Sequence, residues 1–218
     1  MVSHRAHIIY KGLITSGDSF FIPREAFVTT MNEVVIVTSA KDLGGGVAVL
    51  DLLTCTPVCS NFKNCIAEAG AACLVGGGIS SFSGNGSSGD YIAVAQSKKP
   101  TINIYQWGKP QALHQCHVQE ITSALASDRS GRYLCAGSKK GWCTFWELST
   151  GALLHSFQAH FKAVTRVEFT ACGSYCVTVS EDGMARVWEV AQIVDQSEMI
   201  GRAASTSVSS RRAITPYR

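Results

Sequence analysis

The strongest constraint on this chain is an internal repeat in its second half. When residues 130–148 are placed above residues 172–190, six positions carry the same residue type at an offset of 42 positions. The matched pairs are Gly131 with Gly173, Tyr133 with Tyr175, Ser138 with Ser180, Gly141 with Gly183, Trp146 with Trp188, and Glu147 with Glu189. A period of about 42 residues is that of a four-stranded propeller blade. The repeat therefore predicts an all-β chain built from blades.

Short runs of β-branched and aromatic residues, separated by Gly, Ser and Asp, support this fold class. Two earlier and more diverged units end near Asp51 and Trp107, with Leu50 where the first of them would carry a tryptophan. The chain has room for about four units, so we predict a partial β-propeller of antiparallel four-stranded sheets. The expected strands are Val34–Thr38, Val47–Leu50, Tyr91–Gln96, Ile102–Trp107, Tyr133–Ala136, Trp142–Trp146, Val164–Phe169, Tyr175–Val179 and Ala185–Trp188.

Composition changes along the chain suggest three parts. Residues 1–26 form an N-terminal segment without a recognisable pattern, residues 27–195 form the partial propeller, and residues 196–218 form a polar and basic tail that we expect to be disordered. Within the propeller, Gly76 to Gly89 is rich in Gly and Ser and is predicted to be a flexible loop between strands.

Cysteine usage and charge exclude several classes of protein. The chain has nine Cys without a CxxC pair, and Cys73, Cys135 and Cys176 fall at strand positions. We interpret them as reduced, buried thiols, and we expect neither a metal nor a cofactor. The net charge of +3 is too small to indicate nucleic-acid binding by itself. The chain shows neither a clear signal peptide nor an apolar run long enough to span a membrane, which predicts a soluble intracellular protein.

The last unit resembles the WD40 repeat. Its residues run Ala159-His160-Phe-Lys-Ala-Val164, then Gly173, then Ser180-Glu-Asp182-Gly183, then Val187-Trp188-Glu189. In that family a His, a Ser or Thr, an Asp and the Trp form a hydrogen-bonded chain within one blade. The resemblance assigns these roles to four residues, His160, Ser180, Asp182 and Trp188.

The preceding unit carries an incomplete version of this set. It keeps His117, Ser138 and Trp146 but has Lys140 where the last unit has Asp182. We therefore expect a less tightly held third blade, which Lys140→Asp is expected to tighten.

A narrower resemblance covers roughly Val47 to Asp195. In this part the chain is similar to the WD-repeat subunit of the rixosome. The similarity lies in the order of four segments, Lys99-Pro100-x-Ile102, Tyr105-Gln-Trp107-Gly-Lys109, Phe145-Trp146-Glu147-Leu-Ser-Thr-Gly151 and Val187-Trp188-Glu-Val-Ala-Gln-Ile-Val-Asp195. That complex acts on precursors of the large ribosomal subunit, and the family is also linked to replication licensing and chromatin silencing. Members have about seven blades, so the resemblance implies that this chain is a fragment or a truncated form.

The resemblance implies a non-catalytic scaffold in the nucleolus or nucleoplasm, with the cytoplasm as the alternative, whose partners are other protein subunits of a ribosome-assembly complex. The candidate contact residues are Lys98, Lys99, Lys139, Lys140, Phe161 and Lys162. The alternatives are a generic WD40 adaptor and direct binding of pre-ribosomal RNA through Lys139 and Lys140. The sequence contains neither a GxSxG motif nor a plausible nucleophile–base pair, so we expect no catalytic residue, no small-molecule substrate and no membrane partner.

Overall fold

The computed structural model describes residues 15–16, 19–20, 22–28, 33–40, 44–51, 57–59, 62, 65–76, 91–106 and 109–195. Nearly all of the regular structure in this part is antiparallel β-sheet. The segments 77–90 and 196–218, for which we predicted a flexible loop and a disordered tail, lie outside the described residues.

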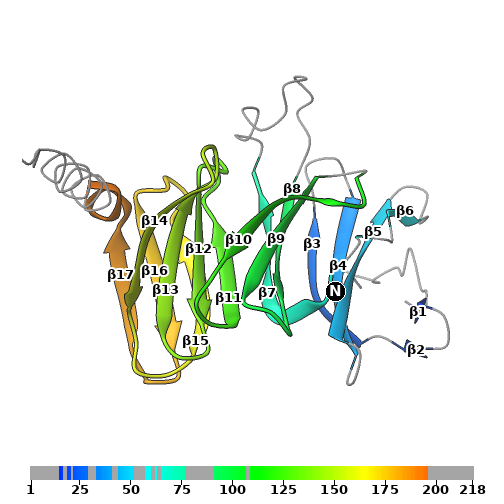
Figure 1. Ribbon diagram of the computed structural model, residues 1–218, viewed down its shortest axis with the longest axis horizontal. Helices are drawn as coiled ribbons and strands as arrows, with labels where there is room; N and C mark the ends of the chain where they lie inside the picture. The colour runs from blue at the N-terminus through cyan, green and yellow to red at the C-terminus, as the bar shows by residue number, and fades with distance from the viewer. Residues whose placement is uncertain are drawn as a thin grey trace, which may run out of the picture.

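Four sheets stand side by side along the long axis of the molecule (Figure 1). The first consists of β3 (Ile22–Val28), β4 (Glu33–Ala40), β5 (Gly44–Asp51) and β6 (Pro57–Cys59). The second consists of β7 (Ala67–Val75), β8 (Tyr91–Gln96), β9 (Thr101–Gln106) and β10 (Ala112–His117). The third consists of β11 (Thr122–Ser127), β12 (Tyr133–Ser138), β13 (Trp142–Glu147) and β14 (Ala152–Gln158).

The fourth sheet has three strands, β15 (Val164–Phe169), β16 (Tyr175–Ser180) and β17 (Ala185–Glu189). The chain then becomes helical over residues 190–195. A short hairpin of β1 (Thr15–Ser16) and β2 (Ser19–Phe20) precedes the first sheet. In every sheet the strands follow one another in chain order, and β7, β11 and β15 pack in succession along one side. This is a partial β-propeller of four blades, as the repeat predicted.

Strand register shows that the repeat continues into the diverged units. Trp188 pairs with Cys176 in the fourth sheet and Trp146 pairs with Leu134 in the third. The residues at the same position are Tyr105, opposite Ile92, in the second sheet and Leu50, opposite Val34, in the first. The second unit thus carries Tyr105 rather than Trp107 at this position, and Trp107 lies outside the described residues.

One predicted boundary was wrong by a few residues. The first sheet begins with β3 at Ile22, so the expected boundary at residue 27 falls inside a strand. The fourth sheet has three strands where we expected four.

In the described part of the chain, no helix is long and apolar enough to cross a membrane.

The sheets are held together by small apolar side chains between neighbouring blades. Between the third and fourth sheets, Ala124, Cys135 and Phe145 pack with Val167 and Cys176. All five are buried, and together they remove a continuous apolar area from water. Burial, followed by contacts with neighbouring thiols, raises the pKa of Cys135 well above its ordinary value. These thiols therefore act as small hydrophobic groups.

Candidate functional site

A chain of three polar contacts ties the loop before β15 to the last strand of the fourth sheet. The Nδ1 atom of His160 lies 3.0 Å from Asp182 Oδ2, and its Nε2 atom lies 2.8 Å from the hydroxyl of Thr178. The same hydroxyl accepts a hydrogen bond from the indole N–H of Trp188 at 2.9 Å. Four residues from a loop, a turn and two strands are thereby joined into one network, which we call the blade network.

One proton arrangement satisfies every member of the blade network. The carboxylate of Asp182 accepts from Nδ1–H of His160, which leaves Nε2 as an acceptor. The hydroxyl of Thr178 donates to that Nε2 and accepts from Trp188. Both His160 and Thr178 are almost completely buried, so a missing partner would leave an unsatisfied polar group in the interior.

Asp182 also fixes the backbone around it. Its carboxylate accepts from the backbone N–H of Phe161 at 3.1 Å and from that of Met184 at 2.9 Å. Partial desolvation opposes ionisation, but the hydrogen bonds from Met184, Phe161 and His160 outweigh it and lower the pKa of Asp182 to about 2. The carboxylate is therefore charged at neutral pH and holds the β14–β15 loop against the β16–β17 turn.

The sequence-based assignment of Ser180 to this network was wrong. Thr178 supplies the hydroxyl, whereas the Ser180 hydroxyl donates to the Lys162 carbonyl at 3.2 Å and accepts from the Asp182 backbone N–H at 3.2 Å. Ser180 thus closes the turn and does not reach the indole.

Strand spacing explains this difference. Thr178 lies opposite Arg186, two residues from Trp188. The Ser180 backbone N–H instead donates to the Met184 carbonyl, so Ser180 lies four residues from the indole along β17. At about 3.3 Å per residue this separation is roughly 13 Å, too far for the indole N–H. Counting along β17 from the tryptophan would have favoured Thr178.

In the third blade the predicted set does not come together. His117 is exposed at the end of β10, and the partly buried residue is its neighbour Val118. In this blade Ala136 stands at the position that Thr178 has in the fourth blade, and it has no hydroxyl. The Ser138 hydroxyl accepts hydrogen bonds from backbone N–H groups of its own turn. Trp146 is buried in an apolar cluster. Apolar packing therefore replaces the blade network here.

The structure reverses the expected effect of Lys140→Asp. The Lys140 ammonium lies 2.7 Å from Glu120 Oε1 at an exposed site, and His117 is not placed to receive a new carboxylate. The substitution replaces an attraction with a repulsion, so we expect the free energy of unfolding to fall by up to about 1 kcal/mol. Urea unfolding measures this. The double variant Lys140→Asp with Glu120→Lys is expected to recover the loss, and a stabilised single variant would contradict our interpretation of this turn.

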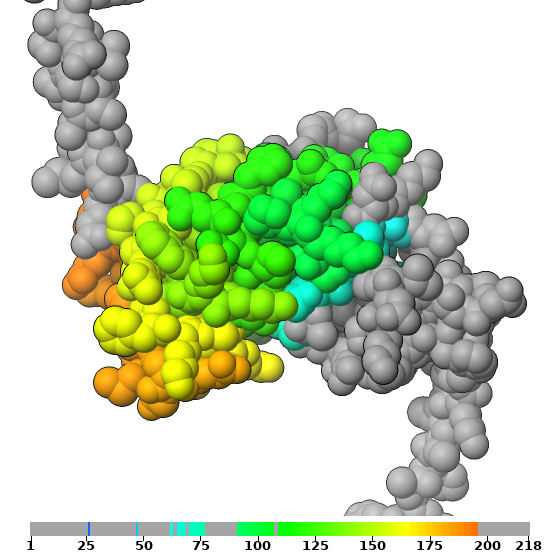
Figure 2. Space-filling model, turned by 60° about the horizontal axis from the view of Figure 1, so that its bottom comes forward, coloured from blue at the N-terminus to red at the C-terminus, as the bar shows by residue number. Residues whose placement is uncertain are grey.

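All six candidate contact residues lie at one end of the sheets, at the bottom of Figure 1. We call the surface that they form the turn face. It consists of Lys98 and Lys99 in the β8–β9 turn, Lys139 and Lys140 in the β12–β13 turn, and Phe161 and Lys162 in the β14–β15 loop. Figure 2 brings this end forward and shows that the second, third and fourth sheets close against one another there. The propeller thus brings together residues that are up to 64 positions apart in the sequence.

Two of the lysines on the turn face are already engaged. Lys139 lies 2.5 Å from Glu68 at the start of β7, and Lys140 is paired with Glu120 as described above. Their charges are partly compensated, which weakens their attraction for phosphate groups.

Two apolar side chains are exposed in the loops of the fourth blade. Phe161 is 83% exposed and Met184 is 55% exposed. Asp182 binds the backbone N–H of both, so each is presented from an ordered turn. An exposed aromatic residue on a fixed backbone is typical of residues that contribute most to a protein interface.

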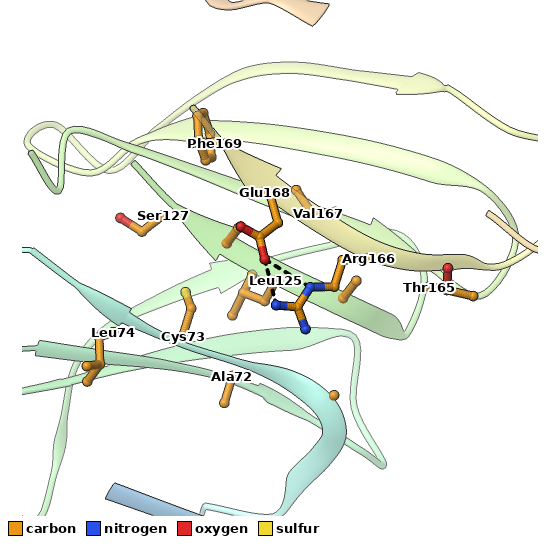
Figure 3. Close-up of a pocket in the computed structure, with 13 residues that line it drawn as sticks. Ala72, Cys73, Leu74, Leu125, Ser127, Thr165, Arg166, Val167, Glu168 and Phe169 are labelled. Carbon is orange, nitrogen blue, oxygen red and sulfur yellow. Dashed lines mark hydrogen bonds and ion pairs between the residues drawn. The ribbon is translucent and has the colours of Figure 1, made fainter. Parts of the chain in front are cut away.

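A hollow lies on the inner side of the blades, between β7, β11 and β15 (Figure 3). Arg166 projects over it, and its guanidinium donates twice to Glu168 Oε1, at 2.6 and 3.0 Å. The other lining residues are uncharged, and include Cys73, Leu125 and Ser127. The two charges compensate each other, so this hollow has no net charge to attract an ionic ligand. Within the described residues no group of three or more His, Cys, Asp or Glu side chains could hold a metal ion.

Comparison with known proteins identifies the repeat. Residues 151–189, which span β14 to β17 and the blade network, match the family described as "WD domain, G-beta repeat". The chain thus contains a WD40 repeat. Among solved structures, the computationally designed Ika4 protein matches 83% of this chain and 98% of its own with a TM-score of 0.56 and 20% identity. The designed Ika8 protein matches 81% of this chain and 48% of its own with a TM-score of 0.57 and 21% identity. Both likenesses show the fold.

Relatives of this chain include proteins named for pre-rRNA processing. It is 32% identical over 128 residues to Pre-rRNA-processing protein crb3/ipi3 of Schizosaccharomyces pombe, covering 59% of this chain and 28% of that protein. It is 31% identical over 161 residues to Protein ROOT INITIATION DEFECTIVE 3 of Arabidopsis thaliana, covering 74% of this chain and 35% of that protein. A Pre-rRNA-processing protein IPI3 of Mycosarcoma maydis is 30% identical over 129 residues, covering 59% of this chain and 22% of that protein. The chain thus spans about a third or less of the length of these relatives.

Proposed function

We propose that this WD40 chain is a non-catalytic scaffold that binds protein subunits of a complex processing pre-rRNA for the large ribosomal subunit. The names of its relatives support the pathway, and they support a nuclear location, in the nucleolus or nucleoplasm. The proposed link to replication licensing rests on the rixosome resemblance alone.

The exposed residues of the turn face are the observation that supports the scaffold role. The turn face presents Phe161, next to Lys162, from a loop that the Asp182 carboxylate holds in place. Met184, which is also exposed, donates its backbone N–H to the same carboxylate. A partner gains affinity by covering a large apolar side chain whose backbone is already ordered, since little conformational entropy remains to be lost. We therefore expect Phe161 to be the main anchor of the interface.

Protein contact is favoured over RNA contact at this surface. Lys139 and Lys140, the two residues chosen for phosphate binding, are each paired with a carboxylate. An RNA backbone would have to displace Glu68 and Glu120 or approach them closely. Proteins bind RNA largely because free cationic side chains replace the counterions at its phosphates. Lysines that are already paired with carboxylates contribute less to this effect.

Affinity purification with quantitative mass spectrometry tests the function and the surface together. The tagged chain is expected to recover large-subunit assembly factors from nuclear extract. Phe161→Ala is expected to lower that recovery about tenfold or more, because truncation of an interface anchor costs about 2 kcal/mol or more. Its melting temperature is expected to stay the same, since the ring is exposed.

Leu153→Ala provides the matched control. Leu153 is also exposed and apolar, at 56%, but it lies near the start of β14, at the opposite end of the sheets. Recovery with this variant is expected to equal that of the unmodified chain. Absence of assembly factors from the unmodified chain would refute the pathway. Equal recovery with Phe161→Ala would refute the surface while leaving the pathway standing.

A further inference from the structure

Backbone hydrogen bonds join the turn face from one turn to the next. The backbone N–H of Val118 donates to the Pro100 carbonyl at 3.0 Å, and that of Lys139 donates to the Ile121 carbonyl at 3.2 Å. The Gly141 carbonyl then accepts from the β14–β15 loop. The β8–β9 turn, the β10–β11 loop, the β12–β13 turn and the β14–β15 loop are thereby connected, so they present their side chains from one ordered surface.

Three lysines of the turn face carry charges that no described carboxylate compensates. Lys98, Lys99 and Lys162 are exposed, and none of them lies within ion-pair distance of a described Asp or Glu. They differ in this from Lys139 and Lys140, which are each paired with a carboxylate. Because the paired lysines stand between the β8–β9 turn and the β14–β15 loop, uncompensated positive charge lies at both ends of the turn face.

Phe161 adds an apolar anchor beside one of these charges. Its loop has a described turn on either side, the β12–β13 turn with Gly141 and the β16–β17 turn with Asp182. The ring is 83% exposed although the blades on both sides of the loop are present, so this exposure belongs to the loop itself. A large apolar side chain and the free ammonium of Lys162 therefore occupy neighbouring positions at one end of the turn face.

The size of this surface suits an extended polypeptide segment. Packed sheets lie about 10 Å apart, so the second and fourth sheets are separated by about 20 Å. An extended chain advances about 3.4 Å per residue, so roughly six residues reach from one end of the turn face to the other. Acidic residues near the two ends of such a segment would meet the free lysines, and an apolar residue next to one of them would meet Phe161.

Spaced carboxylates suit the turn face better than a phosphate backbone does. Glu120 lies on the β10–β11 loop between the free lysines, and Glu181 is exposed in the β16–β17 turn. RNA carries a negative charge at every nucleotide, so its backbone would approach these carboxylates as well as the lysines. A polypeptide can carry acidic residues only where lysines stand, which avoids this repulsion.

The two ends of the chain do not supply the acidic residues. Residues 1–14 contain one arginine, one lysine and neither Asp nor Glu. Residues 196–218 contain four arginines and one glutamate. Their net charge has the same sign as the free lysines, so the complementary charge is expected on another protein.

Given the proposed scaffold function, on which this inference rests, we infer that the turn face binds an extended acidic segment of a partner protein. Acidic residues of that segment meet Lys98 and Lys99 at one end and Lys162 at the other, and an apolar residue covers Phe161. The carboxylates steer the segment and set its register on the surface. The covered aromatic ring supplies most of the affinity.

Photo-crosslinking of the full chain in nuclear extract tests this partner chemistry. The chain carries p-benzoylphenylalanine in place of Gln119, an exposed residue of the β10–β11 loop in the middle of the turn face. The matched control carries it in place of Gln111, which is exposed at the opposite end of the second sheet. After irradiation and digestion, mass spectrometry is expected to identify partner segments at Gln119 in which Asp and Glu outnumber Lys and Arg. Few such adducts are expected at Gln111.

Neutralising the three lysines measures the part that charge plays. The triple variant Lys98→Gln, Lys99→Gln and Lys162→Gln is expected to lower the yield of these adducts about tenfold, because three exposed ion pairs are lost together. Lys109→Gln, at an exposed lysine of the opposite end, is expected to keep the yield. Raising the salt from about 0.1 to 0.5 M is expected to lower the yield with the unmodified chain and to change it little in the triple variant, since salt screens exposed charges.

Four results would overturn the inference. These are partner segments that are not acidic, RNA as the main adduct, an undiminished yield in the triple variant, and a yield at Gln119 no higher than that at Gln111. Melting curves of each variant, measured alongside, show that lost crosslinking does not come from lost folding.

The same experiment separates this inference from the proposed function. Acidic segments that belong to proteins outside large-subunit assembly would refute the pathway and leave the acidic partner standing. Recovery of assembly factors without an acidic adduct at Gln119 would refute the acidic partner and leave the pathway standing.

Discussion

Replacing Gly141 with alanine is expected to lower the free energy of unfolding by roughly 2–6 kcal/mol. Gly141 has φ +85°, a conformation that costs a residue with a side chain about 1–3 kcal/mol. An alanine Cβ would also lie 2.1 Å from the carbonyl oxygen of His160 and 2.8 Å from that of Lys162. These are backbone atoms, so rotation of a side chain cannot relieve the overlap, and such overpacking adds about 1–3 kcal/mol.

The consequence extends beyond the β12–β13 turn. The Gly141 carbonyl accepts from the backbone N–H groups of Ala159 and His160, both at 2.9 Å. A shift of this turn therefore moves the loop that carries His160 and loosens the blade network. Urea unfolding gives the free energy, and the indole N–H resonance of Trp188 reports whether the network survives.

Gly183→Ala is the matched control for this prediction. Gly183 occupies the equivalent turn of the fourth sheet with φ +82°, but no described atom lies within 4 Å of the position that an alanine Cβ would take there. The substitution should cost only the backbone strain of about 1–3 kcal/mol. Equal losses at the two glycines would show that the contact between neighbouring blades contributes nothing, contrary to our expectation.

Replacing Thr178 with valine is expected to lower the free energy of unfolding by about 2–4 kcal/mol. Valine has nearly the shape of threonine, so the change replaces the hydroxyl with a methyl group that can neither donate nor accept a hydrogen bond. Nε2 of the buried His160 and the indole N–H of the partly buried Trp188 then lose their partner. Each unsatisfied buried group costs about 1–3 kcal/mol. The change is measured by urea unfolding monitored through the tryptophan fluorescence.

Ser180→Ala distinguishes this network from the one that the sequence suggested. The Ser180 hydroxyl bonds only within its own turn and to the Lys162 carbonyl, so we expect a loss of about 0.5–1.5 kcal/mol. A larger loss for Ser180→Ala than for Thr178→Val would return the central role to Ser180. It would also contradict the strand register described for β16 and β17.

The fold was predictable because the repeat is a local pattern that recurs. Turn glycines, a tyrosine at the start of one strand and a tryptophan near the end of the next recur at the same offset. Each marks a position in the same antiparallel sheet, and the register of β12 with β13 and of β16 with β17 agrees with that alignment. Even Leu50, the least similar residue at this position, falls in the predicted place.

The candidate site was less predictable because its contacts join a loop, a turn and two different strands. Alternation along β16 places Thr178 and Ser180 on the same face, and both are hydroxyl residues, so pattern alone cannot choose between them. The choice depends on how far each lies from Trp188 across the sheet. The same holds for His117, which matches His160 by sequence spacing but lies exposed, because Val118 takes the inward position.

The sequence by itself determined the blade repeat, the β-strand class of the chain and the turns that carry its exposed lysines and Phe161, because these follow from short patterns repeated at a constant spacing. The tertiary structure alone decided which hydroxyl completes the blade network and which carboxylates pair with Lys139 and Lys140. These depend on register and on contacts between neighbouring blades, where residues far apart in the chain approach within a few ångströms. A linear pattern does not specify such distances.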